Sequence, residues 1–397
     1  RALRRVTGGN GGRDDVALPE SQARWLRVRV FKAGRPGAVA LRQFIVRPLE
    51  WGATPEAFIQ NVAREAPRGA YPRAFSGQQT FWTTVGVPDD TKEVLFGEDG
   101  ALELGGGAGS VEPFLAFDGN LVTWHDATIT QSLPEGRLPI PGVEWRAGDI
   151  NLGISALGVG EAEKSSALAT YEVRNMGGDH RSVMLYLLVR PFQVDPPTQF
   201  LNRPGGTAPI GEIARRGDSL YVDGALRLAS ETPLEGFGAL PFDGGSLLTD
   251  YLKFGRLPAA QAVKDPNRMA SAVLAYRVEL EPGERKAVVI RVPLHDGAPR
   301  LARLDEAASL KDYDGPDYLV PAALARAAWR RELSRVTLDL PGEGALLGQS
   351  VQAQLAWTLI SAAGPALQPG TRSYQRSWIR DGALSASALL RLGQVER

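Results

Sequence analysis

The feature that most constrains the fold is a long strand-like region, residues 71–298, with no regular helical stretch between its apolar runs. Ala169, Tyr171 and Val173 alternate with polar neighbours, and 182–192 is nearly all apolar. Such runs, separated by Gly, Pro and Asp, are typical of antiparallel sheets. Because helices do not alternate with the runs, the sequence predicts a large antiparallel β-sandwich whose central strands are buried on both faces.

The pattern changes to helical spacing after Asp305. Apolar residues recur at intervals of three and four, which predicts helices over about 319–334, 343–361 and 382–392. Gly393 follows the last of these, and glycine is the residue type that most often ends a helix. The fold class is therefore mainly β with a C-terminal α part.

The middle helix carries one apolar stripe, formed by Leu347, Val351, Leu355 and Leu359. A single helical hairpin cannot bury its own stripe, so we expect these four side chains to be exposed. Their full burial would be worth about 1.5–3 kcal/mol each. We therefore also expect the chain to be a piece of a longer protein.

The N-terminal part has a different pattern. Period-two alternation predicts strands at 24–30 and 41–46, joined by turn-type residues, and residues 1–48 resemble the last strands of a discoidin-type jelly roll, a module that often binds glycans or lipid headgroups. Thr54 and Pro55 then read as the N-cap and first residue of a linker helix within 49–70.

Composition excludes several classes of function. Lys plus Arg and Asp plus Glu each total 45, without a long run of one sign, so nucleic acid is not an expected partner and a neutral one fits better. The chain has no Cys, and its three His residues are far apart, so we expect no metal site. The glycine runs lack a P-loop pattern, so no cofactor is expected. No apolar run reaches the length of a membrane span.

An aromatic-x-Arg-Asp turn, Trp378–Asp381, directly precedes the last predicted helix. The segment 356–393 around it resembles the first helical hairpin of six-hairpin glycosidases, the group that includes glucoamylase-like enzymes. In that group a large β-sandwich precedes an α/α toroid, and this turn clasps the sugar at the cleavage site. The resemblance implies a β-sandwich over 71–298, a helical linker over 299–340 and the start of a toroid over 341–397.

The resemblance assigns substrate contacts to Trp378, Arg380, Asp381 and Tyr374. The chemistry fits an oligosaccharide or polysaccharide, because a carboxylate accepts hydrogen bonds from hydroxyl groups while a guanidinium donates hydrogen bonds to neighbouring oxygens. The two aromatic rings would lie against the C–H face of a sugar. Structural roles remain open as alternatives: Asp381 as a helix N-cap, Arg380 in an ion pair and Trp378 in the core.

Glycoside cleavage normally uses two carboxyl groups. By the resemblance both lie on later hairpins, beyond Arg397, so no catalytic residue is expected in this chain. Glu112, Asp126 and Glu144 are assigned to loops and solvated faces. Three functions stay open: part of a glycoside hydrolase, part of a glycoside phosphorylase, or a non-catalytic glycan-binding or cell-surface protein.

Overall fold

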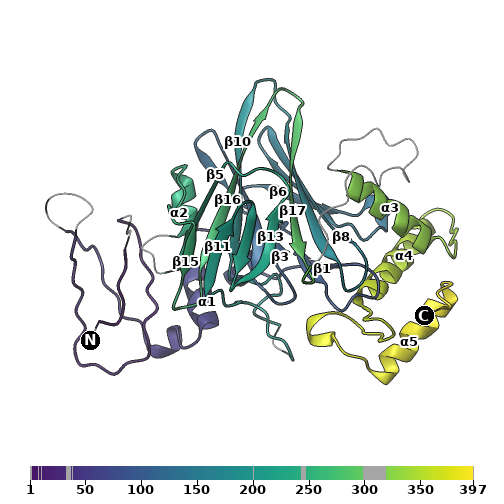
Figure 1. Cartoon of the computed structure of the whole chain (residues 1–397), viewed down its shortest axis with the longest axis horizontal. Helices are drawn as coiled ribbons and strands as arrows, with labels where there is room; N and C mark the ends of the chain where they lie inside the picture. Colours follow the sequence, from purple (N-terminus) through teal and green to yellow (C-terminus); the bar gives the residue numbers. More distant parts are fainter. Residues whose placement is uncertain are drawn as a thin grey trace.

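A computed structural model shows two packed antiparallel sheets with helices beside them (Figure 1). It describes residues 2–396 except 8, 10, 33–36, 38, 200, 243–246 and 298–318. The first half of the predicted helical linker therefore lies outside the described residues. The sheets extend from Trp82 to Pro293, which confirms the predicted sandwich and its antiparallel pairing.

The first sheet has the order β1-β2-β3-β4-β10-β16-β14, with β5 paired to β4. Its long strands pair in register, for example Leu187 of β10 with Leu274 of β16. The strands are β1 (Trp82–Val85), β2 (Val94–Gly97), β3 (Leu102–Glu103), β4 (Ser110–Phe117), β5 (Asn120–Val122), β10 (Arg181–Arg190), β14 (Gly236–Leu240) and β16 (Ser271–Leu280).

The second sheet has the order β15-β11-β12-β13-β17-β9-β8-β7-β6. Its longest strand pairing is β8 with β9, where Ile154 lies opposite Tyr171. The strands are β6 (Thr128–Ser132), β7 (Gly142–Ala147), β8 (Ile150–Val159), β9 (Ser166–Asn175), β11 (Glu212–Arg216), β12 (Ser219–Val222), β13 (Ala225–Ser230), β15 (Ala262–Lys264) and β17 (Arg285–Pro293).

The main core lies between the two sheets, and β10 shows why its sequence is nearly all apolar. Leu185 and Leu187 point into this core. Tyr186 and Leu188 point the other way, into a second cluster that helix α2 (Leu248–Lys253) covers. Since side chains alternate across a strand, a strand buried on both faces needs apolar residues at every position. The prediction for the central strands is thus confirmed.

Helix α1 (Pro55–Glu65) begins as its sequence predicts. The Thr54 hydroxyl accepts a hydrogen bond from the Ala57 amide at 3.1 Å, and Pro55 occupies the first turn, where its missing N–H costs nothing. Short 3₁₀ helices flank the sandwich at η1 (Leu49–Trp51), η2 (Arg73–Ser76) and η3 (Pro134–Gly136).

Among the described residues after the sandwich, the α-helices are α3 (Val320–Leu333), α4 (Gly344–Ser361) and α5 (Ile379–Arg391), close to the predicted ranges. The predicted exposed stripe on α4 is wrong in part. Leu347 is 62% exposed, but Leu355 and Leu359 are buried with Leu138 of the sandwich. The buried face of α4 is rotated from the predicted one because η3 and α3 supply a cover that periodicity alone does not reveal.

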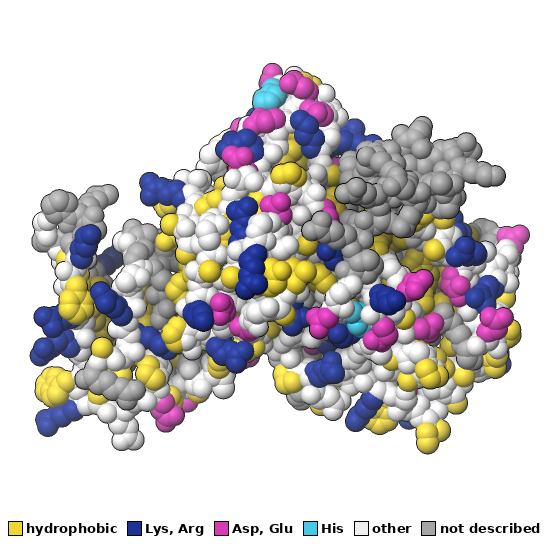
Figure 2. Space-filling view, in the orientation of Figure 1, with side chains coloured by type: hydrophobic (Ala, Val, Ile, Leu, Met, Phe, Trp, Pro, Cys, Tyr) yellow, Lys and Arg dark blue, Asp and Glu magenta, His cyan; other side chains and the backbone are white. Residues whose placement is uncertain are grey.

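The predicted strands at 24–30 and 41–46 do not form. These residues form no regular secondary structure and are exposed, with Trp25 at 83% and Val46 at 65%, and a discoidin-type domain is not supported. Figure 2 shows Lys and Arg side chains over this segment, and residues 21–49 hold no Asp or Glu. Like charges such as Arg27 and Arg42 disfavour pairing of two strands that have no further sheet beside them.

None of the helices in the described part of the chain is long and apolar enough to cross a membrane.

Candidate functional site

The four predicted contact residues lie at the edge of the C-terminal helical segment. Trp378 precedes α5 with 42% of its surface exposed, and Tyr374 ends the 3₁₀ helix η6 (Arg372–Tyr374) at 56%. The Arg380 side chain is 85% exposed and its Nη2 lies 3.5 Å from Asp381 Oδ2. The structure therefore places Arg380 and Asp381 together and leaves all four side chains accessible to a ligand.

One face of Trp378 is covered. The Arg376 guanidinium lies over the indole, 4.0 Å from the ring centroid, which is a favourable cation–π distance. This contact orients the ring, and 42% of the residue's surface stays exposed. The alternative in which Trp378 belongs to the core is wrong, because the residue belongs to none of the buried clusters of the described chain.

Asp381 does not cap the last helix. The helix begins at Ile379, so Asp381 is its third residue, and the residue at the cap position is Trp378, which makes no side-chain cap bond. A carboxylate in the first turn still interacts favourably with the positive end of the helix dipole. The capping alternative is thus wrong. The C-terminal end of α5 follows the prediction: Gly393 has φ +80°, and the Gln394 amide donates to the Leu389 carbonyl at 2.9 Å.

Behind the turn, Arg372 anchors the helical segment to the sandwich. It is 6% exposed, and its Nη2 forms a short ion pair with Glu103 Oε2 on β3. Its Nη1 lies 3.6 Å from Oε1 of Glu93, a carboxylate that also accepts a hydrogen bond from the Thr371 hydroxyl. Buried ion pairs therefore connect the segment before the turn to β3 of the sandwich, although the two are about 270 residues apart in the sequence.

Arg372 adopts this position at a conformational cost. Its φ of +56° is in the left-handed region, which a residue with a Cβ adopts at a cost of roughly 1–2 kcal/mol. The ion pairs must offset that cost. Burial raises the pKa of Glu103 and of Glu93, while the Arg372 charge acts in the opposite direction on both carboxyl groups.

The segment between β10 and β11, here called the arm, also contacts the residues that follow Arg372. Asn202 Nδ2 donates to the Ser373 carbonyl at 2.8 Å, and Arg203 Nη1 donates to Gln375 Oε1 at 2.7 Å. Asp195 lies at the base of this arm, 2% exposed, and its Oδ2 has no hydrogen-bond partner among the described residues. Burial raises the pKa of Asp195 to about 6, against the opposing charge of Arg372.

Asp195→Asn is expected to stabilise the protein at pH 7 and to have little effect near pH 4. The carboxyl group binds its proton more tightly in the folded state than in the unfolded state, so its contribution to the free energy of unfolding falls as the pH rises from about 4 to about 6. Asn has no charge to bury, so it should gain about 1–3 kcal/mol at pH 7. Urea unfolding of both proteins between pH 4 and 7 measures the difference; a constant difference would contradict the assignment.

A second buried ion pair lies within the sandwich, and the sequence assignment of Glu112 to a solvated face is wrong. Glu112 on β4 is 5% exposed, and Arg190 on β10 donates to its Oε1 from Nε at 2.9 Å. The guanidinium also lies over the rings of Tyr71, Phe114 and Phe192. Period-two patterning places both charged residues in strands but cannot reveal that they face each other.

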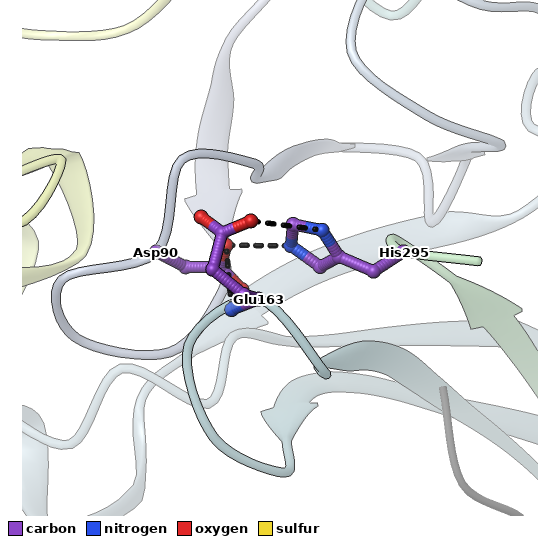
Figure 3. Close-up of side chains that lie close together, drawn as sticks. All are labelled: Asp90, Glu163 and His295. Carbon is purple, nitrogen blue, oxygen red and sulfur yellow. Dashed lines mark hydrogen bonds and ion pairs between the residues drawn. The ribbon is translucent and has the colours of Figure 1, made fainter. Parts of the chain in front are cut away.

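A third cluster combines Asp90, Glu163 and His295 (Figure 3). Asp90 follows β1, Glu163 lies in the turn between β8 and β9, and His295 follows β17. One potential metal-ligating atom from each residue lies within 4.8 Å of the other two. The three are far apart in the sequence, without a spacing motif, so sequence reasoning dismissed this histidine as a ligand.

Comparisons with known proteins show the fold. No family model matches the chain, and no curated protein matches it closely enough to count as a relative. A bacterial glucoamylase solved in complex with acarbose is similar in structure, with a TM-score of 0.51 and 11% identity over 80% of this chain and 50% of that one. A putative kojibiose phosphorylase from the human microbiome matches with a TM-score of 0.33 and 7% identity over 70% of this chain and 35% of that one.

The chain thus spans about half the length of the glucoamylase and shares its fold over most of the described residues. At 11% identity this likeness identifies a fold found in carbohydrate-active enzymes and does not identify a reaction.

Proposed function

We propose that this chain is part of a carbohydrate-active enzyme and binds a neutral oligosaccharide or polysaccharide through Tyr374, Trp378, Arg380 and Asp381. One observation carries the proposal: an exposed tryptophan and arginine and a partly exposed aspartate lie together at a turn. The residue pair before this turn, Thr371 and Arg372, is fixed to the sandwich by hydrogen bonds and ion pairs. A site that positions a ligand needs accessible polar and aromatic side chains that the surrounding structure holds in place.

The chemistry of the four side chains matches a sugar. Asp381 can accept hydrogen bonds from two adjacent hydroxyl groups, and Arg380 beside it can donate hydrogen bonds to their oxygens. The exposed part of Trp378 offers a flat apolar surface for a pyranose ring. In this proposal the turn positions the sugar and does not break the glycosidic bond.

We assign no catalytic acid or base to this chain. The buried carboxylates Glu93, Glu103 and Glu112 are each engaged by an arginine, which stabilises their charge and blocks access to a substrate. A hydrolase and a phosphorylase would both use the proposed sugar contact. A non-catalytic glycan-binding protein would use it as well, so binding is the property to test first.

Asp381→Asn tests the proposal with acarbose and a series of neutral oligosaccharides in isothermal titration calorimetry. Loss of the charged acceptor should weaken binding by about 1.5–3 kcal/mol, which corresponds to roughly 10- to 150-fold. The melting temperature should change little, since an acidic residue in the first turn of a helix contributes only about 0.3–1 kcal/mol.

Asp339→Asn is the matched control, because Asp339 is an exposed aspartate that precedes another helix of the same segment, α4. It should bind like the wild type. If both variants bind equally well, or if the wild type binds none of the sugars, the assignment of this turn to carbohydrate is wrong.

A further inference from the structure

His295 faces two carboxylates, those of Asp90 and Glu163, which lie close to each other (Figure 3). Its Nε2 lies 2.6 Å from Asp90 Oδ1, and its Nδ1 lies 3.5 Å from Glu163 Oε2. His295 and Asp90 are buried at 7% and 2% exposure, whereas the Glu163 side chain is 62% exposed. The Glu163 side of the ring is therefore the side open to solvent.

Asp90 is held as an acceptor for the Nε2 proton. The Ser165 hydroxyl donates to its Oδ2, and the backbone amide of Lys92 donates to its Oδ1 at 3.2 Å. A carboxylate fixed in this way accepts a hydrogen bond from the N–H of one ring nitrogen. The other nitrogen of the neutral ring then carries a lone pair. Metal-binding histidines in proteins have this arrangement, in which a carboxylate behind the ring orients it toward the ion.

The contact between His295 Nδ1 and Glu163 has the spacing of two metal ligands. It is too long for a good hydrogen bond and lacks hydrogen-bond geometry, unlike the contact with Asp90. Two ligands at about 2.0 Å from a tetrahedral zinc ion lie roughly 3.3 Å apart. Glu163 is itself positioned, because the Thr91 hydroxyl donates to its second oxygen at 2.6 Å.

The local charge is also compatible with a bound cation. Asp90 and Glu163 both face the same ring, and no Lys or Arg of the described residues forms an ion pair with either. With a neutral imidazole the cluster would carry two negative charges, one of them buried. We propose that His295 and Glu163 bind a divalent transition-metal ion such as Zn²⁺, with Asp90 orienting the imidazole and water completing the coordination.

Such an ion would strengthen the junction between the sandwich and the helices. Asp89, next to Asp90, donates its amide to the Leu359 carbonyl of α4 at 3.2 Å and accepts from the Gly364 amide at 3.1 Å. Fixing Asp90 through His295 and Glu163 therefore fixes the turn on which the end of α4 rests. Bound metal should slow hydrogen exchange in this turn and in the β8–β9 turn.

The test uses the full chain, freed of metal with a chelator and of any affinity tag, and titrated with Zn²⁺. Calorimetry should show one equivalent bound, and saturating Zn²⁺ should raise the melting temperature by roughly 2–4 °C. Glu163→Gln should abolish both effects without threatening the fold, since Glu163 is exposed. His295→Gln provides a second loss-of-ligand variant.

His180 and Glu279 provide a matched control. They form a similar histidine–glutamate contact at 3.4 Å, but both side chains are about half exposed and no carboxylate of the described residues forms an ion pair with the other nitrogen of His180. Glu279→Gln should leave Zn²⁺ binding unchanged. The proposal is overturned if the wild type binds no Zn²⁺, if Glu279→Gln abolishes binding, or if Glu163→Gln binds normally. A melting temperature that responds to pH but not to Zn²⁺ would also overturn it and indicate a proton on Nδ1.

Discussion

Replacement of Arg372 by methionine is expected to lower the free energy of unfolding by about 3–5 kcal/mol, the usual cost of breaking a buried ion pair from one side. The variant leaves Glu103, with no exposed surface, and Glu93 without their cation. Methionine keeps much of the side-chain volume, so the lost free energy of unfolding measures the removal of the positive charge and not a loss of packing. It also keeps the Cβ that makes a φ of +56° unfavourable, with no ion pair left to offset it.

The effect should depend on pH with a definite sign. Burial raises the pKa of both carboxyl groups, and removal of Arg372 removes the charge that opposes this rise. In the variant the folded state holds protons that the unfolded state releases, so its stability should fall as the pH rises above about 4. Urea unfolding at pH 4.5 and pH 8 should therefore show a larger loss at pH 8.

Hydrogen exchange locates the damage. Loss of protection is expected first in α5 and in residues 372–375, while β10 inside the sandwich stays protected. A double variant with Glu103→Gln, which removes one unpaired charge, should recover part of the lost stability. Equal stability of wild type and Arg372→Met, or loss of protection that begins in β10, would show that Arg372 is not the anchor of the helical segment.

The sequence predicted those parts of the fold that depend on local patterns. The alternation of Ala169, Tyr171 and Val173 predicts a strand with one face in the core, and these residues lie in the main core on β9. The Thr54–Pro55 start of α1 depends only on residues within one turn, so it could be predicted to the residue. The order of sandwich and helices followed in the same way from a change of period.

Features that depend on distant partners were missed. Only the second half of the predicted α4 stripe, Leu355 and Leu359, is buried, because its cover includes Leu138, far away in the sequence. The partners of Arg372 and of His295 lie between about 130 and 280 residues away, so no spacing motif could reveal the anchor or the metal-like cluster. The aromatic-Arg-Asp turn was found because its four residues are consecutive, but the role proposed for it depends on the buried anchor at Arg372.

The second large effect concerns the sandwich itself. Glu112→Ala is expected to lower the free energy of unfolding by about 3–5 kcal/mol, because Arg190 would remain buried without its carboxylate. Two donor groups of the guanidinium would lose their acceptor, and only its bond to the Ala70 carbonyl would remain. The loss should affect the whole sandwich in one transition, since Arg190 and Glu112 join neighbouring central strands.

Glu144→Ala is the matched control. Glu144 is also a strand glutamate paired with an arginine, Arg146, at 3.1 Å, but the two side chains are 39% and 59% exposed. Exposed pairs contribute about 0–1 kcal/mol, so this variant should unfold almost like the wild type. If the two alanine variants lose the same stability, burial does not explain the importance of Glu112.

A double variant, Glu112→Leu with Arg190→Met, separates the cost of an unpaired charge from the value of the pair. Apolar replacement of both partners of a buried pair is often neutral or stabilising, because neither charge must be removed from water. Methionine can keep the apolar contact with Tyr71, Phe114 and Phe192 that the arginine now makes. The double variant should therefore be more stable than Glu112→Ala. If it is equally unstable, the ion pair itself, and not merely the avoidance of a buried unpaired charge, stabilises this part of the sandwich.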